Sequence, residues 1–136
     1  YAAKRNEKIT TIFINNGVFG MTGGQTAPTS LEGQIATTAK NGVDYEVFGE
    51  PLKLAELIST FNVGYAARGS IANFKEYQTT KGYIKKAIEC QKSGKGYSFV
   101  EIMAPCPTNW KLSATDALDH IENVTSKYFK LGELKG

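Results

Sequence analysis

The stretch from Asn15 to Gln25 constrains the fold more than any other part of the chain, because it joins a buried strand to a glycine-rich turn. The preceding run, Ile9 to Ile14, is dense in β-branched and aromatic residues, which is typical of a parallel strand covered on both faces. The turn itself, NNGVFGMTGGQ, contains four glycines. Ligands of open α/β sheets bind beyond the carboxyl ends of the strands. The stretch therefore predicts an α/β fold with a ligand site at this turn.

Helical and strand patterns alternate along the rest of the chain. After the first strand, the sequence predicts a helix over 51–61, a strand over 62–68, a helix over 74–92, a strand over 97–103 and a final helix from Ser113. Such alternation produces a parallel sheet with helices on both faces, joined by right-handed connections. Residues 15–50 show no regular period, and we expect a functional loop with one helical turn there. The basic tail to Gly136 is expected to be frayed.

Capping residues and apolar stripes place the three helices. Pro51 suits the first position of the first helix. Asn73 with Glu76 forms a capping pair for the second helix. Ser113 with Asp116 starts the third. The side chains expected to face the core are Leu54, Leu57, Ile58 and Phe61 in the first helix, Tyr77, Ile84, Ala87 and Ile88 in the second, and Ala117, Ile121, Val124 and Tyr128 in the third.

Composition excludes several classes of protein. The chain has 136 residues, 41% of them hydrophobic, which is enough for a single domain over residues 1–136 with one core. The net charge is +3 and the Lys and Arg residues are scattered, so we expect no nucleic-acid surface. No run of 18 apolar residues is present to span a membrane. Two cysteines and no visible export signal indicate a reduced, cytoplasmic setting.

The first six residues, Tyr1 to Asn6, have the pattern of a helix end. Small and basic residues precede an Asn at a stop position, and the chain does not begin with Met. We therefore expect a domain truncated at its N-terminus, with a short ordered lead-in as the alternative. Three strands alone would leave an apolar edge or face uncovered, which favours a missing N-terminal half or a tightly bound partner.

Neutral oxygen donors at the end of the first strand suit a hard metal ion. Mg²⁺ prefers octahedral oxygen ligands, usually one or two protein groups with phosphate and water. The Asn16 amide oxygen and the Val18 carbonyl, together with a diphosphate, would fit that preference, although no carboxylate lies nearby. The alternative is that Asn15, Asn16 and Gly17 only form a turn. Further on, the two glycines of Thr22-Gly23-Gly24-Gln25 would let the backbone approach a ligand closely.

The run NNGVFGMTGGQTAPT, from Asn15 to Thr29, resembles the thiamine-diphosphate site of the β subunit of 2-oxoacid:ferredoxin oxidoreductases. Those subunits carry the signature N-N-x-x-[YF]-G-M-T-G-G-Q-x-[SA]-P-T. The stretches GKGYSFVE from Gly94 and PCPTNW from Pro105 are similar to two later motifs of the same family. The resemblance covers essentially the whole chain, and it implies the C-terminal half of a thiamine-diphosphate-binding domain of the PP type.

The resemblance implies a role for each residue of the glycine-rich stretch. Asn16 would ligate Mg²⁺ through its side chain and Val18 through its backbone carbonyl. The residues that would line the diphosphate and the reacting end of the cofactor are Met21, Thr22, Gly23, Gly24 and Gln25. The third metal ligand of the family is the Asp of an upstream G-D-G motif. This sequence contains no G-D-G, which agrees with the expected truncation.

The two cysteines have different expected roles. By itself, Cys106 would be read as a small buried residue. By resemblance, it is the last thiolate ligand of a 4Fe–4S cluster whose other three cysteines lie in an N-terminal part of the subunit. Cys90 is expected in the core. His120 is expected at a helix boundary without a catalytic role, and Arg68 with Glu101 to form a strand-end ion pair rather than to line a site.

The implied function is oxidative decarboxylation of a 2-oxoacid to an acyl-coenzyme A with reduction of ferredoxin. Thiamine diphosphate, Mg²⁺ and a 4Fe–4S cluster are the implied cofactors. An α subunit, with γ and δ subunits in some members, and ferredoxin are the implied partners. The substrate stays open between 2-oxoisovalerate, 2-oxoglutarate and pyruvate, with the first two closest in motif. The alternatives are an inactive folded fragment without the G-D-G half, and another thiamine-diphosphate enzyme such as an acetolactate synthase.

Overall fold

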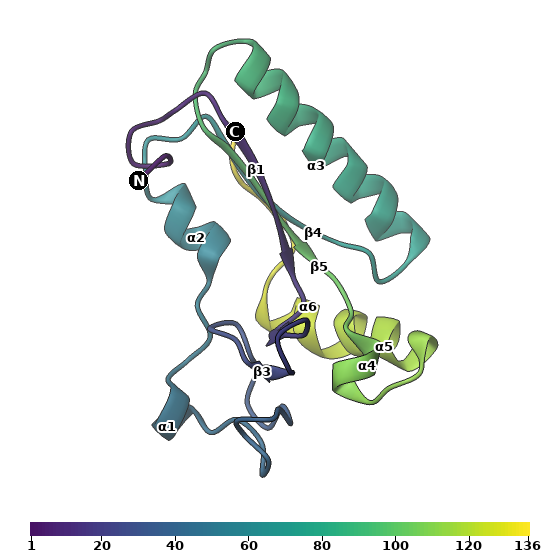
Figure 1. Ribbon diagram of the computed structural model, residues 1–136. Helices are drawn as coiled ribbons and strands as arrows, with labels where there is room; N and C mark the ends of the chain where they lie inside the picture. Colours follow the sequence, from purple (N-terminus) through teal and green to yellow (C-terminus); the bar gives the residue numbers. More distant parts are fainter.

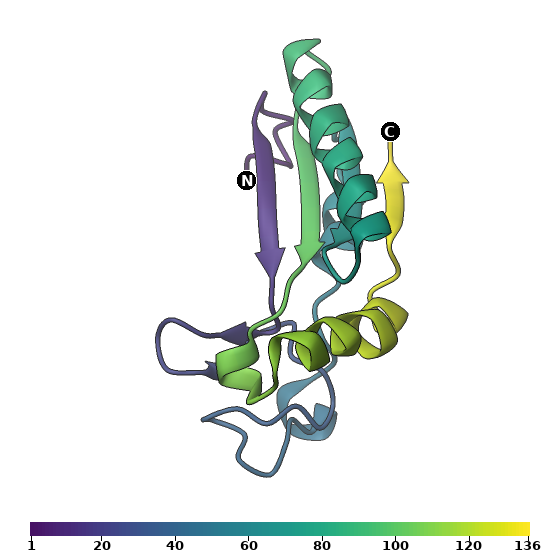
Figure 2. The same ribbon diagram turned by 90° about the vertical axis from the view of Figure 1, so that its right-hand side faces the viewer.

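A four-stranded sheet forms the centre of the computed structural model, which describes all 136 residues. The strand order is β1-β5-β4-β6 (Figure 1, Figure 2). The strands are β1 (Thr10–Asn15), β5 (Ser98–Met103), β4 (Tyr65–Ser70) and β6 (Gly132–Lys135). The first three are parallel, and β6 is antiparallel to β4. The predicted α/β architecture is confirmed, whereas the expected frayed tail is wrong, because residues 132–135 close one edge of the sheet.

Helices cover both faces of the sheet. Helix α2 (Leu54–Ser59) lies on one face and α3 (Phe74–Lys92) on the other (Figure 1). Alternate residues of each strand point to opposite faces. Phe99 therefore packs with Ala55 on the α2 side, whereas Val100 packs with Ala87 on the α3 side. Every residue of β4 and β5 is buried as a result.

The open edge of the sheet is β1. Its side chains Ile12 and Ile14 are 40% and 55% exposed, because they point to the α3 face but α3 packs over β4 and β5. The structure thus shows the partly uncovered apolar edge that the strand count predicts. None of the helices combines the length and the apolar character that crossing a membrane requires.

A layer of loops and short helices lies beyond the carboxyl ends of the three parallel strands (Figure 2). It contains the small hairpin of β2 (Val18–Phe19) and β3 (Gln25–Thr26), together with α1 (Tyr45–Phe48) and α4 (Pro107–Trp110). The last helical segment runs through α5 (Ala114–His120), the π-helical turn η1 (Ile121–Thr125) and α6 (Ser126–Tyr128). A loop with one helical turn is therefore present over residues 15–50, as expected, with the hairpin in addition.

The register of the strands places their ends side by side. Asn15 of β1 and Ser70 of β4 both lie opposite Met103 of β5. The residues that leave these three strands thus enter the loop layer at one level. This alignment brings Asn15, the loop after β5 and the end of β4 to a common edge, as expected for an α/β site.

Both predicted capping pairs are confirmed. The Asn73 side chain accepts a hydrogen bond from the Glu76 backbone N–H at 2.9 Å, and Ser113 accepts one from the Asp116 N–H at 3.1 Å. Cys90 lies in the core as expected. Pro51, in contrast, precedes the helix that it was expected to begin, because α2 starts at Leu54. The helix therefore starts one turn later than the proline suggested.

Four side chains expected to face the core are exposed instead: Leu57, Tyr77, Ile88 and Val124. In α3 the inward positions belong to Thr80, Ala87 and Cys90, so a polar side chain takes part in the contact with the sheet. The π-helical turn inserts one residue into the final helix. The stripe therefore moves from Val124 to Phe129, which is only 1% exposed, whereas Tyr128 packs against the core as expected.

Two glycines allow a paired test of the packing between α3 and the sheet. A Cβ on Gly69 of β4 would collide with the side chain of Thr80, whose hydroxyl bridges the backbone of Ser70. Gly69→Ala should lower the free energy of unfolding of the chain by about 3 kcal/mol, as overpacking does. Gly82 lies exposed in α3 with nothing near its missing Cβ. Gly82→Ala should raise the free energy by about 1 kcal/mol.

Urea denaturation of the two variants beside the parent chain measures both changes. A loss for Gly82→Ala would contradict the expected gain in helix propensity at this exposed position. A neutral Gly69→Ala would contradict the close packing of Thr80 on β4.

Candidate functional site

Asn15, the last residue of β1, anchors the turn at the end of the strand. It is 4% exposed. Its Nδ2 donates to Glu101 Oε1 at 2.7 Å, and its Oδ1 accepts from the Gly17 backbone N–H at 3.0 Å and from Thr29 Oγ1 at 2.8 Å. One buried amide thus ties the central sheet, the turn and the loop at Thr29 together.

A buried ion pair lies beneath Asn15. Arg68 Nε donates to Glu101 Oε2 at 2.8 Å, and both side chains are fully buried. Arg68 also binds both oxygens of Glu56 on α2, and the centre of its guanidinium group lies 5.2 Å from the ring centroid of Phe129. The expected ion pair between Arg68 and Glu101 is confirmed.

Arg68 and its second partner, Glu56, are held in their ionised forms. Burial alone would lower the pKa of Arg68, but its hydrogen bonds to Glu56 and the charge of Glu101 outweigh burial and raise it. Burial likewise raises the pKa of Glu56, yet the hydrogen bond and charge of Arg68 bring it below its ordinary value. The arginine therefore stays charged at the centre of the sheet.

The residues predicted to ligate a metal lie directly after Asn15. Asn16 is half-buried, and its Oδ1 accepts only the Val18 backbone N–H, at 3.3 Å. That is a long hydrogen bond for an amide oxygen, and the oxygen keeps a free lone pair. The turn expected as the alternative is thus present, and it places the Asn16 amide oxygen next to the backbone of Val18.

Gly17, between Asn16 and Val18, is held by two side chains of the following loop. The Gly17 carbonyl accepts from Ser30 Oγ and from Gln34 Nε2, each at 2.7 Å. Gly17 itself has a φ of +63°, which glycine adopts without strain. Gly17 is therefore fixed through its N–H by Asn15 and through its carbonyl by Ser30 and Gln34.

The glycine-rich loop after the turn is open to solvent at its tip. Met21 is fully exposed, and Thr22 and Gly23 are exposed as well. Thr22 Oγ1 donates to Gln25 Oε1 at 3.1 Å, and Gln25 Nε2 donates to the Thr22 carbonyl at 2.9 Å. The predicted ligand-lining residues thus lie together on one short hairpin, with Gly24 as its buried member.

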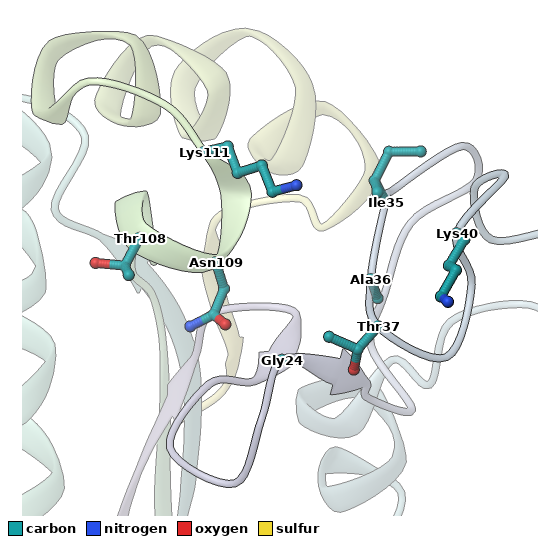
Figure 3. A pocket seen from close by; sticks show the side chains of 8 residues that line it. All are labelled: Gly24, Ile35, Ala36, Thr37, Lys40, Thr108, Asn109 and Lys111. Atoms are coloured by element: carbon teal, nitrogen blue, oxygen red, sulfur yellow. The ribbon is translucent and has the colours of Figure 1, made fainter.

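A cavity of about 380 Å³ lies beside Gly24, between the hairpin and α4 (Figure 3). Lys40 and Lys111 line it from different segments of the chain, together with Thr37, Thr108 and Asn109. No carboxylate lines this cavity. Two ammonium groups with hydroxyl and amide donors give it the chemistry of a site for an anionic group.

Cys106 lies at the start of α4, next to the glycine-rich loop. It is partly exposed, and its Sγ accepts from Asn109 Nδ2 at 3.1 Å. A Cβ on Gly20 would approach this sulfur to 3.1 Å. The structure contains no group of three or more His, Cys, Asp and Glu side chains able to hold a metal. Cys90 is buried against the sheet on the α3 side, so Cys106 has no second thiol beside it.

His120 contacts an aromatic ring. Its imidazole lies edge-on to Trp110, with ring centroids 5.2 Å apart. Burial lowers the pKa of His120 from 6.5. The boundary position expected for this histidine is confirmed. The backbone N–H of Trp110 also donates to the Cys106 carbonyl at 2.9 Å.

Several residues of this site were not identified from the sequence. Thr29, Ser30 and Gln34 hold the turn, and Asn109 packs against both Gly24 and Cys106. Only the position of Thr29 at the end of the fifteen-residue motif indicated that it could belong to the site. The strand order that brings Glu101 beside Asn15 is not encoded in any local pattern.

Comparison with known proteins finds similar sequences over most of the chain. Residues 1–102 match the family model described as thiamine pyrophosphate enzyme, C-terminal TPP binding domain. Ketoisovalerate oxidoreductase subunit VorA of Methanothermobacter thermautotrophicus is 41% identical over 129 residues, which cover 94% of this chain and 27% of that protein. 2-Oxoglutarate synthase subunit KorB of Methanothermobacter marburgensis is 37% identical over 108 residues, which cover 79% of this chain and 34% of that protein. The chain spans about a third or less of the length of these curated relatives.

A solved structure shares the fold. It is a 2-oxoglutarate:ferredoxin oxidoreductase from Magnetococcus marinus with 2-oxoglutarate, coenzyme A and succinyl-CoA bound. The match has a TM-score of 0.62 and 25% sequence identity, and it covers 90% of this chain and 38% of that one.

Substitution of Gly24 tests the contact between the glycine-rich loop and α4. Gly24 has a φ of +76°, and a Cβ there would come within 2.6 Å of Asn109 Oδ1. Gly33 is the matched control, because it has a φ of +74° and nothing within 4 Å of its missing Cβ. Gly33→Ala should cost about 1 kcal/mol from the backbone conformation alone. Gly24→Ala should cost at least about 1 kcal/mol more in chemical denaturation. Equal losses would mean that Asn109 yields without cost.

The pH dependence of stability tests the burial of His120. A histidine whose folded pKa lies below 6.5 binds its proton more weakly in the folded chain than in the unfolded chain. The free energy of unfolding should therefore fall as the pH drops from 6.5 toward the lower folded pKa. His120→Phe keeps an aromatic ring against Trp110 and should reduce this slope in denaturation curves at about pH 7.5, 6.5 and 5.5. An unchanged slope would assign the pH dependence to another group.

Proposed function

Because the chain belongs to the family of the C-terminal TPP-binding domain of thiamine pyrophosphate enzymes, we propose that it forms part of the cofactor site of a 2-oxoacid:ferredoxin oxidoreductase. The observation that carries this proposal is the turn from Asn16 to Val18 at the end of β1. It joins an available amide oxygen to a glycine-rich hairpin at the edge of the sheet where ligands bind. The names of the relatives support the type of reaction.

The donor atoms at this turn fit Mg²⁺. Asn16 Oδ1 and the Val18 carbonyl are neutral oxygens on one rigid turn, and Mg²⁺ accepts one or two protein oxygens beside phosphate and water. We propose these two as protein ligands. By the family resemblance, the ligand that completes the set would be the Asp of a G-D-G motif, and this sequence contains no such motif. The isolated chain is accordingly proposed to be inactive.

The protein positions the cofactor, and the cofactor supplies the electron sink that cleavage of the bond between the carboxyl and 2-oxo carbons requires. The exposed tip formed by Met21, Thr22 and Gly23 is open to a ligand from solvent. The Gly24 backbone and the hydrogen-bonded pair of Thr22 and Gln25 keep the tip in one conformation. These residues orient the diphosphate and the reacting end of the cofactor.

Cys106 is proposed as one thiolate ligand of a 4Fe–4S cluster. Its sulfur is partly exposed and accepts a hydrogen bond from Asn109. Hydrogen bonds to ligating sulfur atoms tune the reduction potential of such clusters. The chain holds one such thiol, so the other three cysteines must come from outside these 136 residues. The cluster would carry electrons toward ferredoxin, the acceptor named for the relatives.

The substrate is a 2-oxoacid, and the comparisons favour 2-oxoisovalerate. Two ketoisovalerate oxidoreductase subunits are 41% and 44% identical to this chain, whereas four 2-oxoglutarate synthase subunits are 35% to 37% identical. Coenzyme A is the proposed acyl acceptor, because the related solved structure contains it. An α subunit of the same enzyme is the proposed partner, in keeping with the subunit names of the relatives. We place the assembled enzyme in the cytoplasm.

Replacement of Asn16 tests the metal site in the complete enzyme. Asn16→Ala removes one metal ligand, so the variant should retain at least about tenfold less thiamine diphosphate after desalting, as loss of a metal's support does. Asn41→Ala is the matched control, because Asn41 is exposed and lies outside the site. Equal cofactor content in both variants, measured by fluorescence of the oxidised cofactor, would refute the ligand role of Asn16.

Replacement of Cys106 tests the cluster in the same enzyme. Cys106→Ala should abolish or strongly reduce the electron paramagnetic resonance signal of one reduced 4Fe–4S cluster, since four thiolates hold such a cluster. Cys90→Ala changes a buried cysteine between α3 and the sheet and should leave the signal intact. An intact signal in Cys106→Ala would remove this residue from the ligand set.

A further inference from the structure

Three polar residues on neighbouring strands form one row beneath the metal-binding turn. Arg68 of β4 and Glu101 of β5 lie directly opposite each other, and Asn15 of β1 lies two residues farther along its strand than the partner of Glu101. All three point to the α2 face of the sheet. Arg68 and Glu101 are 0% exposed and Asn15 is 4% exposed. Arg68 donates to Glu101 at 2.8 Å, and Asn15 donates to the other oxygen of Glu101 at 2.7 Å.

We propose that this row positions the Asn16–Val18 turn for metal binding, with Glu101 and Arg68 acting through Asn15. The proposal rests on the proposed function, because it assigns a role to residues behind the metal-binding turn. Neither Glu101 nor Arg68 reaches the turn itself. Their effect passes through the orientation of one amide group.

Glu101 determines that orientation. An ionised carboxylate accepts hydrogen bonds and donates none. One oxygen of Glu101 is occupied by Arg68, so its other oxygen requires a donor, and the Nδ2 of Asn15 is the donor present. The Oδ1 of Asn15 must then face the turn, where it accepts from Gly17 and Thr29. A flipped amide would set an oxygen against the carboxylate and an NH₂ group against the Gly17 N–H.

Stability alone does not explain such a row. Two buried charges are costly to remove from water, and well-packed apolar residues often stabilise a protein as much or more. The neighbouring inward positions of the same strands are apolar, as Ala66 and Phe99 show. Mg²⁺ demands near-ideal octahedral geometry, so a displacement of the turn would weaken the metal site. A fixed amide orientation meets that demand.

The test compares Glu101→Gln with Glu56→Gln in the complete enzyme. The first substitution keeps the shape of the side chain, but an amide cannot accept from both Arg68 and Asn15 through its two terminal atoms. Glu56 also binds Arg68, yet it makes no contact with Asn15. Both variants should lower the melting temperature. Glu101→Gln should also weaken the binding of Mn²⁺, used in place of Mg²⁺, about tenfold or more in the presence of thiamine diphosphate, and Glu56→Gln should leave it unchanged.

The free Mn²⁺ signal in electron paramagnetic resonance gives the dissociation constant without any measurement of activity. Thr29→Val provides a second variant that keeps the shape of the side chain and removes only the hydrogen bond to Asn15 Oδ1. It should weaken Mn²⁺ binding about threefold to tenfold, and it serves if Glu101→Gln does not fold.

The possible failures are distinguishable. If Glu101→Gln and Thr29→Val both bind Mn²⁺ as tightly as the parent enzyme while Asn16→Ala binds it weakly, the positioning role is overturned and the proposed function stands. If Glu56→Gln weakens binding as much as Glu101→Gln does, the row has only a structural role. If Asn16→Ala itself binds Mn²⁺ normally, the proposed metal site is wrong, and the positioning role is overturned with it.

Discussion

The buried ion pair of Arg68 and Glu101 is the interaction on which the rest of the site depends. It lies at the centre of the sheet, where two unpaired charges would be prohibitively costly. The pair is tolerated because each charge has further partners: Arg68 binds Glu56 and lies against Phe129, and Glu101 binds Asn15. Helix α2, the last helical segment and β1 are thereby fixed relative to the two central strands.

The proposed metal-binding turn is held by residues that connect this sheet to the loop layer. Asn15, at the end of β1, accepts a hydrogen bond from the Gly17 N–H of the turn. Ser30 and Gln34 donate to the Gly17 carbonyl of the same turn. Asn16 is left with an amide oxygen that only one long hydrogen bond engages. A rigid backbone with an available oxygen is what a metal that demands strict geometry requires. The glycine-rich hairpin and the start of α4 extend this surface to Gly24, Asn109 and Cys106.

The sequence predicted the elements that local patterns specify. Strand β1 and helix α3, with its Asn73 cap, follow from apolar periodicity and capping chemistry. Strand β6 could not be predicted in this way, because residues 132–135 (GELK) are short and polar. The strand is stabilised by its pairing with β4. The π-helical turn that brings Phe129 into the core likewise depends on tertiary packing. Within the site, Asn16 and Val18 were identified from a motif, whereas the link from Asn15 to Glu101 depends on strand order.

A crystal structure of the complete enzyme with Mg²⁺ and thiamine diphosphate tests the central claim most directly. The account predicts that Asn16 Oδ1 and the Val18 carbonyl lie about 2.1 Å from the metal, the ordinary distance for a magnesium ligand. It also predicts that Asn15 still bridges Glu101 and Gly17 beneath them. A metal held by other residues, with Asn16 turned away from it, would contradict the account.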